Sequence, residues 1–567
     1  MPSVLSSLRS YRPKTLRLDL VAGVSVWAVL VPESLAYATI AGVPPVVGLY
    51  AAIPALILYA IFGSSRILVV ATMSATAALS ASIVADFAAP SGQDFIAITA
   101  ALAIVTGILG IAAGLARLGF LANFISEPVL KGFIVGLALT IIAGQLPELF
   151  GVTKESGNFF QEIAGLIGNL PSTNSATLAV GLVSLTVVLG FRRWLPLLPG
   201  SLAAVVLGIL ATTLLDLPAK GVEVVGPISA GLPSVGLPDG LGFEDYLALG
   251  LAAAGVLLLG FVEGLGPAKT YAARDGYDVD ANRELIGLGA ANLGAGLTSG
   301  MVVNGSLSKS AVNANSGART QLSGLTVAAL TVITLLFLTG LFESLPEATL
   351  AAVVIAAVIE LVDFPALARF YRVWTGALGQ IYGWAARADF IAATAALVGV
   401  LVFDTLPGLF IGITISVLLL VFRSSRPEVA ALGRSIEPGG VQSMWVDTTR
   451  HPEILVRDDI SVLRVESALF FANADNVRSA IRQHITEKTI GVVLDLATTP
   501  AIDVTATEML AQLAQELRGR GVRLVVAHGI GQVRDFLQRA GSDTDVLQAL
   551  YATVDEAVAS FDESREN

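Results

Sequence analysis

The sequence predicts a polytopic α-helical membrane protein built from two related halves and followed by a separate α/β domain. Of the 567 residues, 54% are hydrophobic and 14% are charged, and the mean hydropathy is +0.76. Apolar stretches of about 20 residues, the length that crosses a bilayer, recur along residues 19–423. Beyond Arg426 short apolar runs alternate with amphipathic stretches, which is typical of an α/β domain.

Residues 1–18 are expected to form a short cytoplasmic segment. Arg9, Arg12 and Lys14 precede the first apolar stretch, and the positive-inside rule places such a basic end in the cytoplasm. The first stretch is interrupted by VPES and is followed by many more, so it is not a signal peptide. A transmembrane domain is therefore expected at 19–426.

The apolar runs number about fourteen, some of them too short to cross a bilayer alone. They form two halves, at 19–216 and 244–423, which are separated by a loop rich in proline and glycine at 217–243. An even number of crossings returns the chain to the cytoplasm, in agreement with the basic residues Arg423 and Arg426 after the last run. Both termini are expected on the cytoplasmic side of a plasma (inner) membrane.

Polar residues interrupt the third element of each half. In the first half, β-branched residues precede Thr72 and a hydroxyl-rich helix is expected to start at Ser74. In the second half, a β-like run at 300–303 precedes an expected turn at Asn304 and Gly305. Broken segments at matching places in two halves are typical of the central site of a transporter, although serine and threonine also serve as packing contacts between membrane helices.

The second broken segment carries a cation among hydroxyl groups. Ser306, Ser308 and Ser310 open the expected helix, and Lys309 lies among them. A charge inside an apolar region is costly unless it binds something. The start of a helix attracts anions through its free N–H groups and its dipole. The sequence therefore predicts an anion site to which Lys309 adds a full charge.

Composition excludes several other classes of function. The chain has no cysteine, and its three histidines, His451, His484 and His528, all follow the last apolar run. No metal site and no cofactor are therefore expected in the membrane part, and carboxylates remain as the proton carriers. The net charge of −11 leaves no basic footprint for nucleic acid. A membrane enzyme is not supported, because no acid/base pair lies outside the expected transport core.

Four stretches resemble, in order, the sulfate-transporter signatures of the SulP family of anion transporters, which includes plant sulfate transporters and prestin. They are VPESLAYATIAGVPPVVGLYAAIPALILYAIFGSSR from Val31, DGYDVDANRELIGLGAANLGAGLTS from Asp275, GSLSKSAVNANSGARTQLSG from Gly305 and FESLPEATLAAVV from Phe342. The resemblance implies about fourteen segments in a 7+7 inverted repeat, with a core domain that moves against a gate domain. It also implies a homodimer.

The same resemblance implies an anion site between the half-helices of the third and tenth segments. The implied substrate contacts are Thr72, Met73 and Ser74 in the third segment and Ser306, Leu307, Ser308 and Lys309 in the tenth. This chain departs from many relatives, which have Gly-Pro at the positions of Ala71 and Thr72 and arginine at that of Lys309. Because lysine cannot form the bidentate fork of arginine, substrate preference does not carry over directly.

Two carboxylates inside the apolar runs are the candidate proton-coupling groups, Glu263 and Glu33. Glu33 lies beside Pro32 in the first run, and Glu263 lies between glycines in GFVEGLGP. Burial favours the protonated form of a carboxyl group and a nearby cation favours the ionised form, and this opposition suits a proton carrier. Proton-coupled plant relatives have glutamate at the position of Glu263, whereas several animal relatives have glutamine at that of Glu33. Either group remains open to a structural role, as a hydrogen-bond acceptor or as a permanent partner of Lys309.

Residues 441–563 resemble a STAS domain, the C-terminal module of SulP proteins. Strands are expected at ISVLRVES, IGVVLDLA and VRLVVAHG, and helices at NADNVRSAIRQHI, VTATEMLAQLAQELRGRG and VRDFLQRAG. In this module a serine or threonine that follows the loop aspartate is often phosphorylated. Here Val504 follows Asp503, which excludes that modification and leaves Thr505 as a weak substitute. A regulatory partner of the domain is expected.

The predicted function is secondary active transport of an inorganic oxyanion, with sulfate:proton symport by alternating access as the leading hypothesis. A bicarbonate or dicarboxylate transporter, with sodium as a coupling ion, and a passive anion channel are the alternatives. The carboxylates at 33 and 263 argue against a channel, since a leak needs no titratable coupling group. The expected partners are a small inorganic anion, the lipid bilayer and a second copy of the chain.

Overall fold

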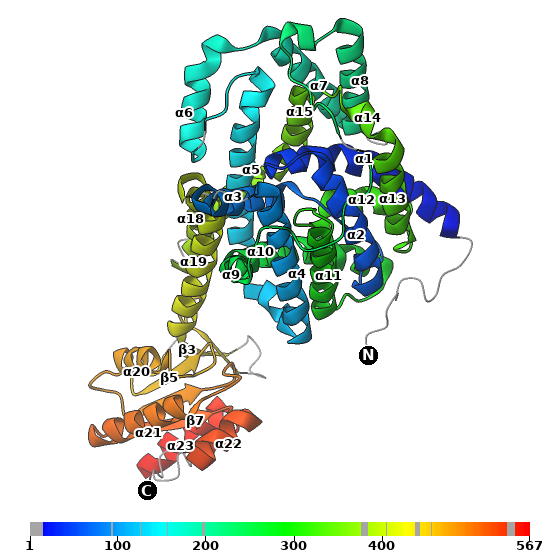
Figure 1. The fold of residues 1–567 in the computed structure, drawn as a ribbon. Helices are drawn as coiled ribbons and strands as arrows, with labels where there is room; N and C mark the ends of the chain where they lie inside the picture. Colours follow the sequence, from blue (N-terminus) through cyan, green and yellow to red (C-terminus); the bar gives the residue numbers. More distant parts are fainter. Residues whose placement is uncertain are drawn as a thin grey trace. The chain divides into compact units, whose positions relative to one another are not determined.

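A computed structural model describes residues 15–566, except 92–93, 125, 156, 196–198, 229, 376–383, 404, 437–442, 455 and 541–549. Most of the segment predicted at 1–18 therefore lies outside the described residues, as does position 441, where the STAS domain is expected to begin. The chain divides into two compact units, Met1–Ser416 and Val417–Asn567. Figure 1 shows the helices of the first unit and the α/β arrangement of the second.

The first unit is built from helices. Its first half contains α1 (Leu16–Ile40), α2 (Val46–Phe62), α3 (Ser74–Ser91), α4 (Phe95–Leu115), α5 (Glu127–Phe150), α6 (Phe159–Asn169), α7 (Ser175–Trp194) and α8 (Gly200–Leu215). Its second half contains α9 (Phe243–Ala248), α10 (Gly250–Asp275), α11 (Ala281–Leu297), α12 (Leu307–Asn315), α13 (Leu322–Ile333), α14 (Thr339–Phe342), α15 (Glu347–Val358), α16 (Phe364–Thr375), α18 (Trp384–Phe403) and the first part of α19 (Thr405–Ser425), whose last residues belong to the second unit. Between the halves lies the short helical turn η4 (Pro218–Lys220), and no further helix begins before α9 in the described part of that loop.

Seven helical segments among the described residues are long and apolar enough to cross a membrane, and four more apolar helices are shorter. One of the seven is the continuous run Leu322–Phe342, which contains α13 and α14. The predicted polytopic α-helical membrane fold is confirmed. Two helices were not predicted from the sequence, α6 and α16. They span 11 and 12 residues, so neither has the length of a membrane crossing.

Small residues let the helices of the two halves pack closely. A Cβ atom on Gly107 of α4 would lie 2.4 Å from the backbone nitrogen of Leu293 in α11, and one on Gly289 would lie 2.6 Å from that of Ile111. Close approach of backbones through glycine is a common way for membrane helices to associate. The glycine-rich sequence of α11 therefore joins it to the first half.

Two short strands pair within this unit, at 69–71 and 304–306, and we call this paired segment the crossing. Strands β1 (Val69–Ala71) and β2 (Asn304–Ser306) pair antiparallel, with Val69 opposite Ser306. The predicted turn at Asn304 and Gly305 is wrong, because both residues belong to β2. The β-like run at 300–303 is not itself paired with a strand: the Asn292 side chain donates to the carbonyl of Val303 and accepts from its N–H, each at 2.9 Å.

Each strand leads directly into a helix, which confirms the predicted pattern of a strand followed by a helix start in both halves. Helix α3 begins at Ser74 and helix α12 at Leu307. Antiparallel pairing places these two starts at the two ends of one short ladder. The free N–H groups of both helices are thereby brought into one region of the molecule.

The second unit contains a six-stranded sheet in the order β4-β3-β5-β6-β7-β8. The strands are β3 (Val429–Ile436), β4 (Ser443–Asp447), β5 (Ile460–Val465), β6 (Gly491–Asp495), β7 (Arg523–Ala527) and β8 (Leu550–Tyr551). Strands β5 to β8 run parallel, and β3 is antiparallel to both of its neighbours. The helices are α20 (Ala474–Gln483), α21 (Val504–Gly519), α22 (Gly531–Ala540) and α23 (Val554–Glu566).

Alternating residues of the sheet serve two separate cores. Val492 and Leu494 of β6 pack with α20, α21 and α22, whereas Val493 packs with Phe561 of α23 on the other face. The three predicted strands and three predicted helices are confirmed. The sheet also includes β3, which lies ahead of the expected start at 441. Ala430 and Leu432 of β3 belong to the same core as Phe561 of α23.

Candidate anion site

Side chains from α12 and the turn after it hold β1 and the loop that precedes it. Ser310 Oγ accepts from the N–H of Val69 at 2.9 Å, and Asn313 Nδ2 donates to the carbonyl of Ile67 at 2.9 Å. Gln321 Nε2 donates to the carbonyls of Ser65 and Leu68, both at 2.9 Å. Irregular backbone inside a membrane protein needs such internal partners. The second half of the chain thus fixes the broken segment of the first half.

Glu284 of α11 holds the same loop from the other side. This fully buried carboxylate accepts from Tyr59 Oη at 2.6 Å, from the N–H and Oγ of Ser64, both at 2.7 Å, and from the N–H of Ser65 at 3.1 Å. Buried Asp19 has a comparable role, because it accepts from the backbone N–H groups of Arg319 and Thr320. Neither carboxylate was singled out from the sequence. Both lie in apolar or signature stretches, and only their donors reveal the role.

Lys309 lies at the crossing and is fully buried. Its Nζ is 2.6 Å from Glu33 Oε2 of α1, donates to the carbonyl of Thr72 at 3.3 Å and lies 4.9 Å from the centre of the Tyr37 ring. Tyr37 Oη donates to the same carboxylate oxygen at 3.3 Å. The ammonium group is therefore compensated by one carboxylate. The structure brings together three residues predicted for the site, Lys309, Glu33 and Thr72.

The predicted hydroxyl contacts divide into buried and exposed groups. Ser306 caps α12, since its Oγ accepts from the N–H of Lys309 at 3.2 Å, and it lies 3.3 Å from Ser308 Oγ. Thr72 Oγ1 donates to Ser34 Oγ at 3.0 Å, which occupies that hydroxyl proton. Ser74 is buried and Met73 is half-buried, whereas Ser308 and Leu307 are exposed. Of the predicted hydroxyls, that of Ser308 is the exposed one.

Glu263 reaches the crossing through β2. Its Oε2 accepts from Asn304 Nδ2 at 3.1 Å, and Asn304 Oδ1 accepts from the N–H of Gly305 at 2.6 Å. Glycine permits this approach: a Cβ atom on Gly264 would lie 3.2 Å from Asn304 Oδ1. Asn304, Tyr37 and Ser34 are the contacts that sequence reasoning missed. Asn304 was predicted as a turn residue, so no hydrogen bond of its side chain to Glu263 was predicted.

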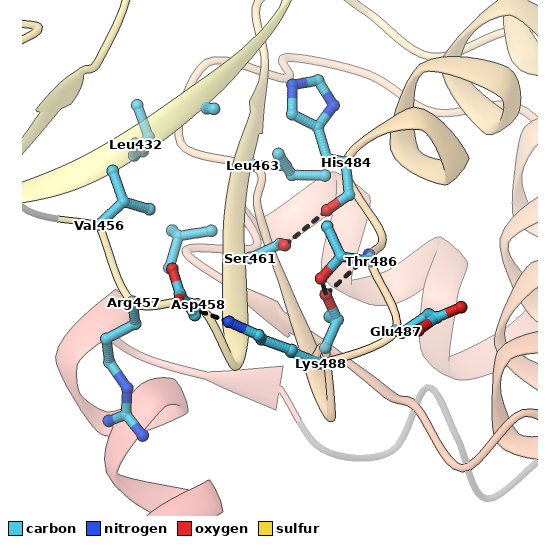
Figure 2. A pocket seen from close by; sticks show the side chains of 13 residues that line it. Leu432, Val456, Arg457, Asp458, Ser461, Leu463, His484, Thr486, Glu487 and Lys488 are labelled. Carbon is cyan, nitrogen blue, oxygen red and sulfur yellow. Dashed lines mark hydrogen bonds and ion pairs between the residues drawn. The ribbon is translucent and has the colours of Figure 1, made fainter.

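The STAS-like unit has a cavity of its own, of about 560 Å³, beside β3 and β5 (Figure 2). Among the lining residues, Lys488 and Asp458 form an ion pair of 3.4 Å, and Ser461 Oγ donates to the carbonyl of His484 at 2.9 Å. The loop at Asp503, where relatives are often phosphorylated, does not line this cavity. There Asp503 caps α21 by accepting from the N–H of Ala506 at 2.8 Å, and Val504 and Thr505 are exposed.

Comparison with known proteins identifies this arrangement. Residues 16–379 match the model of the sulfate permease family, which is more than half of the chain. The chain belongs to the sulfate permease family. Residues 451–557 match the STAS domain, which identifies the second unit.

Relatives in the sulfate permease family align along nearly the whole chain. A probable sulfate transporter of Mycobacterium tuberculosis is 35% identical over 98% of this chain and 96% of its own length. Probable sulfate transporter 4.2 of Arabidopsis thaliana is 30% identical over 94% of this chain and 79% of its own, and the chloroplastic sulfate transporter 4.1 of the same plant is 30% identical over 94% and 78%.

Solved structures share the fold. The murine Solute Carrier 26 family member A9 anion transporter, in the inward-facing state, matches with a TM-score of 0.86 at 23% identity, over 98% of this chain and 93% of its own. The transmembrane domain of a cyanobacterial bicarbonate transporter, BicA, matches with a TM-score of 0.60 at 22% identity, over 72% and 98%. This sulfate permease family member is a multi-pass membrane anion transporter with a STAS domain, and it is not an enzyme.

Proposed function

We propose that this sulfate permease family member is a secondary active transporter that carries sulfate together with a proton by alternating access. The observation that supports it is the buried Lys309–Glu33 pair at the crossing of the two half-helices. The Mycobacterium and Arabidopsis relatives are named as probable sulfate transporters. A tetrahedral oxyanion suits a site made of one ammonium group, hydroxyls and helix starts.

Competition for Lys309 supplies the coupling. An ionised Glu33 holds the ammonium group at 2.6 Å and repels an anion that enters beside it. Protonation of Glu33 removes this charge and leaves Lys309 free to donate charge-assisted hydrogen bonds to the anion. The exposed hydroxyl of Ser308 and the N–H groups at the start of α12 supply further donors. Proton and anion therefore bind together, and by linkage each raises the affinity of the other.

Glu263 is the second coupling group in this proposal. It has no contact with Lys309 among the described hydrogen bonds and ion pairs, and it acts on Asn304 of β2 instead. A change in its protonation alters the hydrogen bond that fixes Asn304, and thereby the strand that leads into Ser306. Proton release from Glu263 during the transport cycle then moves the hydrogen-bond donors at the start of α12 and does not act on Lys309 directly.

The membrane setting completes the proposal. Basic residues flank both ends of the apolar region, Arg17 at the start of α1 and Arg423 and Arg426 at the end of α19. They support cytoplasmic termini in a plasma (inner) membrane. The transporter works as a homodimer, and a regulator that binds the STAS domain controls it.

Uptake by proteoliposomes tests the proposed function. Labelled sulfate, bicarbonate and fumarate are supplied to the reconstituted full chain with and without a proton gradient. We expect sulfate to be accumulated when the outside is more acidic, and its affinity to fall by up to about tenfold per pH unit as pH rises, the limit for one linked proton. If bicarbonate or fumarate is taken up as fast as sulfate or faster, sulfate is not the preferred substrate. Equilibration that does not depend on the proton gradient indicates a channel.

Two glutamine variants test the coupling groups. Glu33→Gln mimics a permanently protonated acid, so sulfate binding should persist and lose its dependence on pH. Glu263→Gln should bind sulfate but lose gradient-driven uptake. Glu244→Gln, which changes an exposed carboxylate of α9, is the matched control and should behave as the wild type. Gradient-driven uptake in the Glu33→Gln, Glu263→Gln double variant would rule out symport through these groups.

A further inference from the structure

Three carboxylates from separate parts of the membrane unit meet at one end of α5 and α15. Glu148 lies near the end of α5, Glu223 follows η4, and Glu347 is the first residue of α15. One carboxylate oxygen of each lies within 4.8 Å of those of the other two. The three side chains line a cavity of about 410 Å³. Helix α15 packs against α5 and α7 in this region (Figure 1).

The described residues that line this cavity include three carboxylates and one cation, so negative charge is in excess there. Three ionised carboxylates at such distances repel one another, and a bound cation removes this cost. Lys154 also lines the cavity, but its ion pair is with Glu162, at 3.7 Å.

A second observation points to the same ligand. Thr177 of α7 lines the cavity and is 4% exposed, and its Oγ1 has no hydrogen-bond partner among the described residues. A buried hydroxyl without a partner is costly, and it is rare in folded proteins. A hydroxyl oxygen is a ligand for a hard cation. It supplies a neutral donor beside the three carboxylates.

We propose that Glu148, Glu223, Glu347 and Thr177 form a Ca²⁺ site. Oxygen ligands lie about 2.3–2.6 Å from Ca²⁺, so oxygens on opposite sides of the ion are about 4.6–5.2 Å apart. The carboxylate oxygens all lie within 4.8 Å of one another, so they are close enough to share one such ion. All the donors are oxygens, which Ca²⁺ prefers, and waters in the cavity complete its coordination. The site needs no histidine or cysteine, the residues whose distribution led to the expectation of no metal.

The ion joins three elements that already meet. The N–H of Glu347 donates to the carbonyl of Glu223 at 3.0 Å, and Leu149, Ala352 and Ile355 form an apolar cluster between α5 and α15. Bound Ca²⁺ therefore locks the loop between the two halves onto both helices. With a cytoplasmic N-terminus, α5 as the fifth membrane-spanning segment ends on the outer face of the membrane. Extracellular Ca²⁺ sites have dissociation constants of about 10⁻⁴–10⁻³ M.

Calcium binding is measured on the full chain in nanodiscs after treatment with a chelator, by equilibrium dialysis with ⁴⁵Ca²⁺ and by thermal unfolding. We expect saturable binding of one ion and a rise in Tm. Glu148→Gln and Glu223→Gln should each weaken binding by about tenfold or more, because affinity follows the number of charged ligands. Thr177→Val keeps the side-chain shape and should weaken binding less. Glu155→Gln, at an exposed carboxylate outside the cavity, is the control and should bind as the wild type.

Other outcomes overturn the proposal. Absence of saturable binding to the wild type, or unchanged affinity in Glu148→Gln and Glu223→Gln together, removes the site. Mg²⁺ that competes as strongly as Ca²⁺ removes the assignment to Ca²⁺. Stabilisation by acid alone, with no bound Ca²⁺, makes the cluster a proton site. Should the glutamine variants fail to fold, Thr177→Val with unchanged affinity would still refute it. None of these readouts depends on sulfate transport.

Discussion

Three of the described residues contact the ammonium group of Lys309, and each acts on its charge in a different way. The Glu33 carboxylate supplies the opposite charge, the Thr72 carbonyl accepts a hydrogen bond, and the Tyr37 ring presents its face to the cation. An ammonium group without a counter-charge is not stable in a buried position. Whatever replaces Glu33 during transport must therefore be an anion.

Replacing Lys309 tests this directly. Lys309→Ala should weaken sulfate binding by about 2–5 kcal/mol, the usual cost of losing one partner of a buried charge pair. Lys309→Arg should keep transport but change the order of preferred anions, since its planar fork favours bidentate partners. Calorimetric titration of sulfate into the purified protein measures both.

Lys131→Ala is the control for charge loss. Lys131 forms an ion pair with Asp363 at 3.0 Å, and both side chains are about one-third exposed. Neither residue contacts Lys309 in the described hydrogen bonds and ion pairs. Its variant should bind sulfate normally. Unchanged sulfate affinity in Lys309→Ala would place the anion site elsewhere.

At the scale of elements, the crossing of β1 and β2 depends on the absence of side chains. Gly305 of β2 faces α10, where a Cβ atom on Gly305 would lie 2.8 Å from the Cα atom of Gly264. The same contact brings Asn304 to Glu263. The distance between β2 and α10 therefore determines where the hydrogen-bond donors at the start of α12 lie. It also determines whether Asn304 reaches Glu263.

Three glycine variants form a graded series. Gly305→Ala must move backbone and should abolish sulfate uptake while costing about 1–3 kcal/mol of stability, as overpacking does. Gly264→Ala, with 3.2 Å to Asn304 Oδ1, should reduce uptake less. Gly266→Ala lies on the same helix with nothing within 4 Å and should match the wild type. Equal uptake in all three, measured with thermal stability, would show that this approach does not matter.

Sequence patterns within one segment predicted the helices and strands that such patterns define. Long apolar runs gave the membrane helices, and alternation of apolar strands and amphipathic helices gave the parallel part of the STAS sheet. The pairing of β2 depends on β1, which is far away in the sequence, so Asn304 and Gly305 were assigned to a turn by their composition alone. Strands β3, β4 and β8 were missed for a similar reason, since each is short or gains its place from a neighbouring strand.

The site shows the same limit. Serine, lysine and the helix start within one segment were enough to predict donors for an anion. The sequence named Glu33 as a partner of Lys309 only as an alternative, because nothing in the spacing fixes which side chain of α1 faces α12. Tyr37 and Asn304 could not be predicted without knowing which faces meet.

At the scale of the whole molecule, α19 connects the membrane part with the STAS unit. Within the second unit, Asn473 Nδ2 donates to the carbonyl of Ser424 at 3.3 Å, and Asn476 Nδ2 donates to that of Ser425 at 2.7 Å. These bonds satisfy carbonyl groups at the end of α19. Strand β3 follows almost at once, so the boundary between membrane helix and sheet is narrow.

The position of a truncation should therefore decide its outcome. Removing residues 427–567 deletes the whole sheet, and the remaining membrane part should be monodisperse and bind sulfate with unchanged affinity, because its core is its own. Removing residues 441–567 leaves β3 without β4 and β5, its two partners. An apolar strand with both edges free promotes aggregation, so this longer product should be the less soluble one. Size-exclusion chromatography and sulfate titration compare them, and loss of sulfate binding in a monodisperse 1–426 product would mean that the STAS unit takes part in forming the anion site.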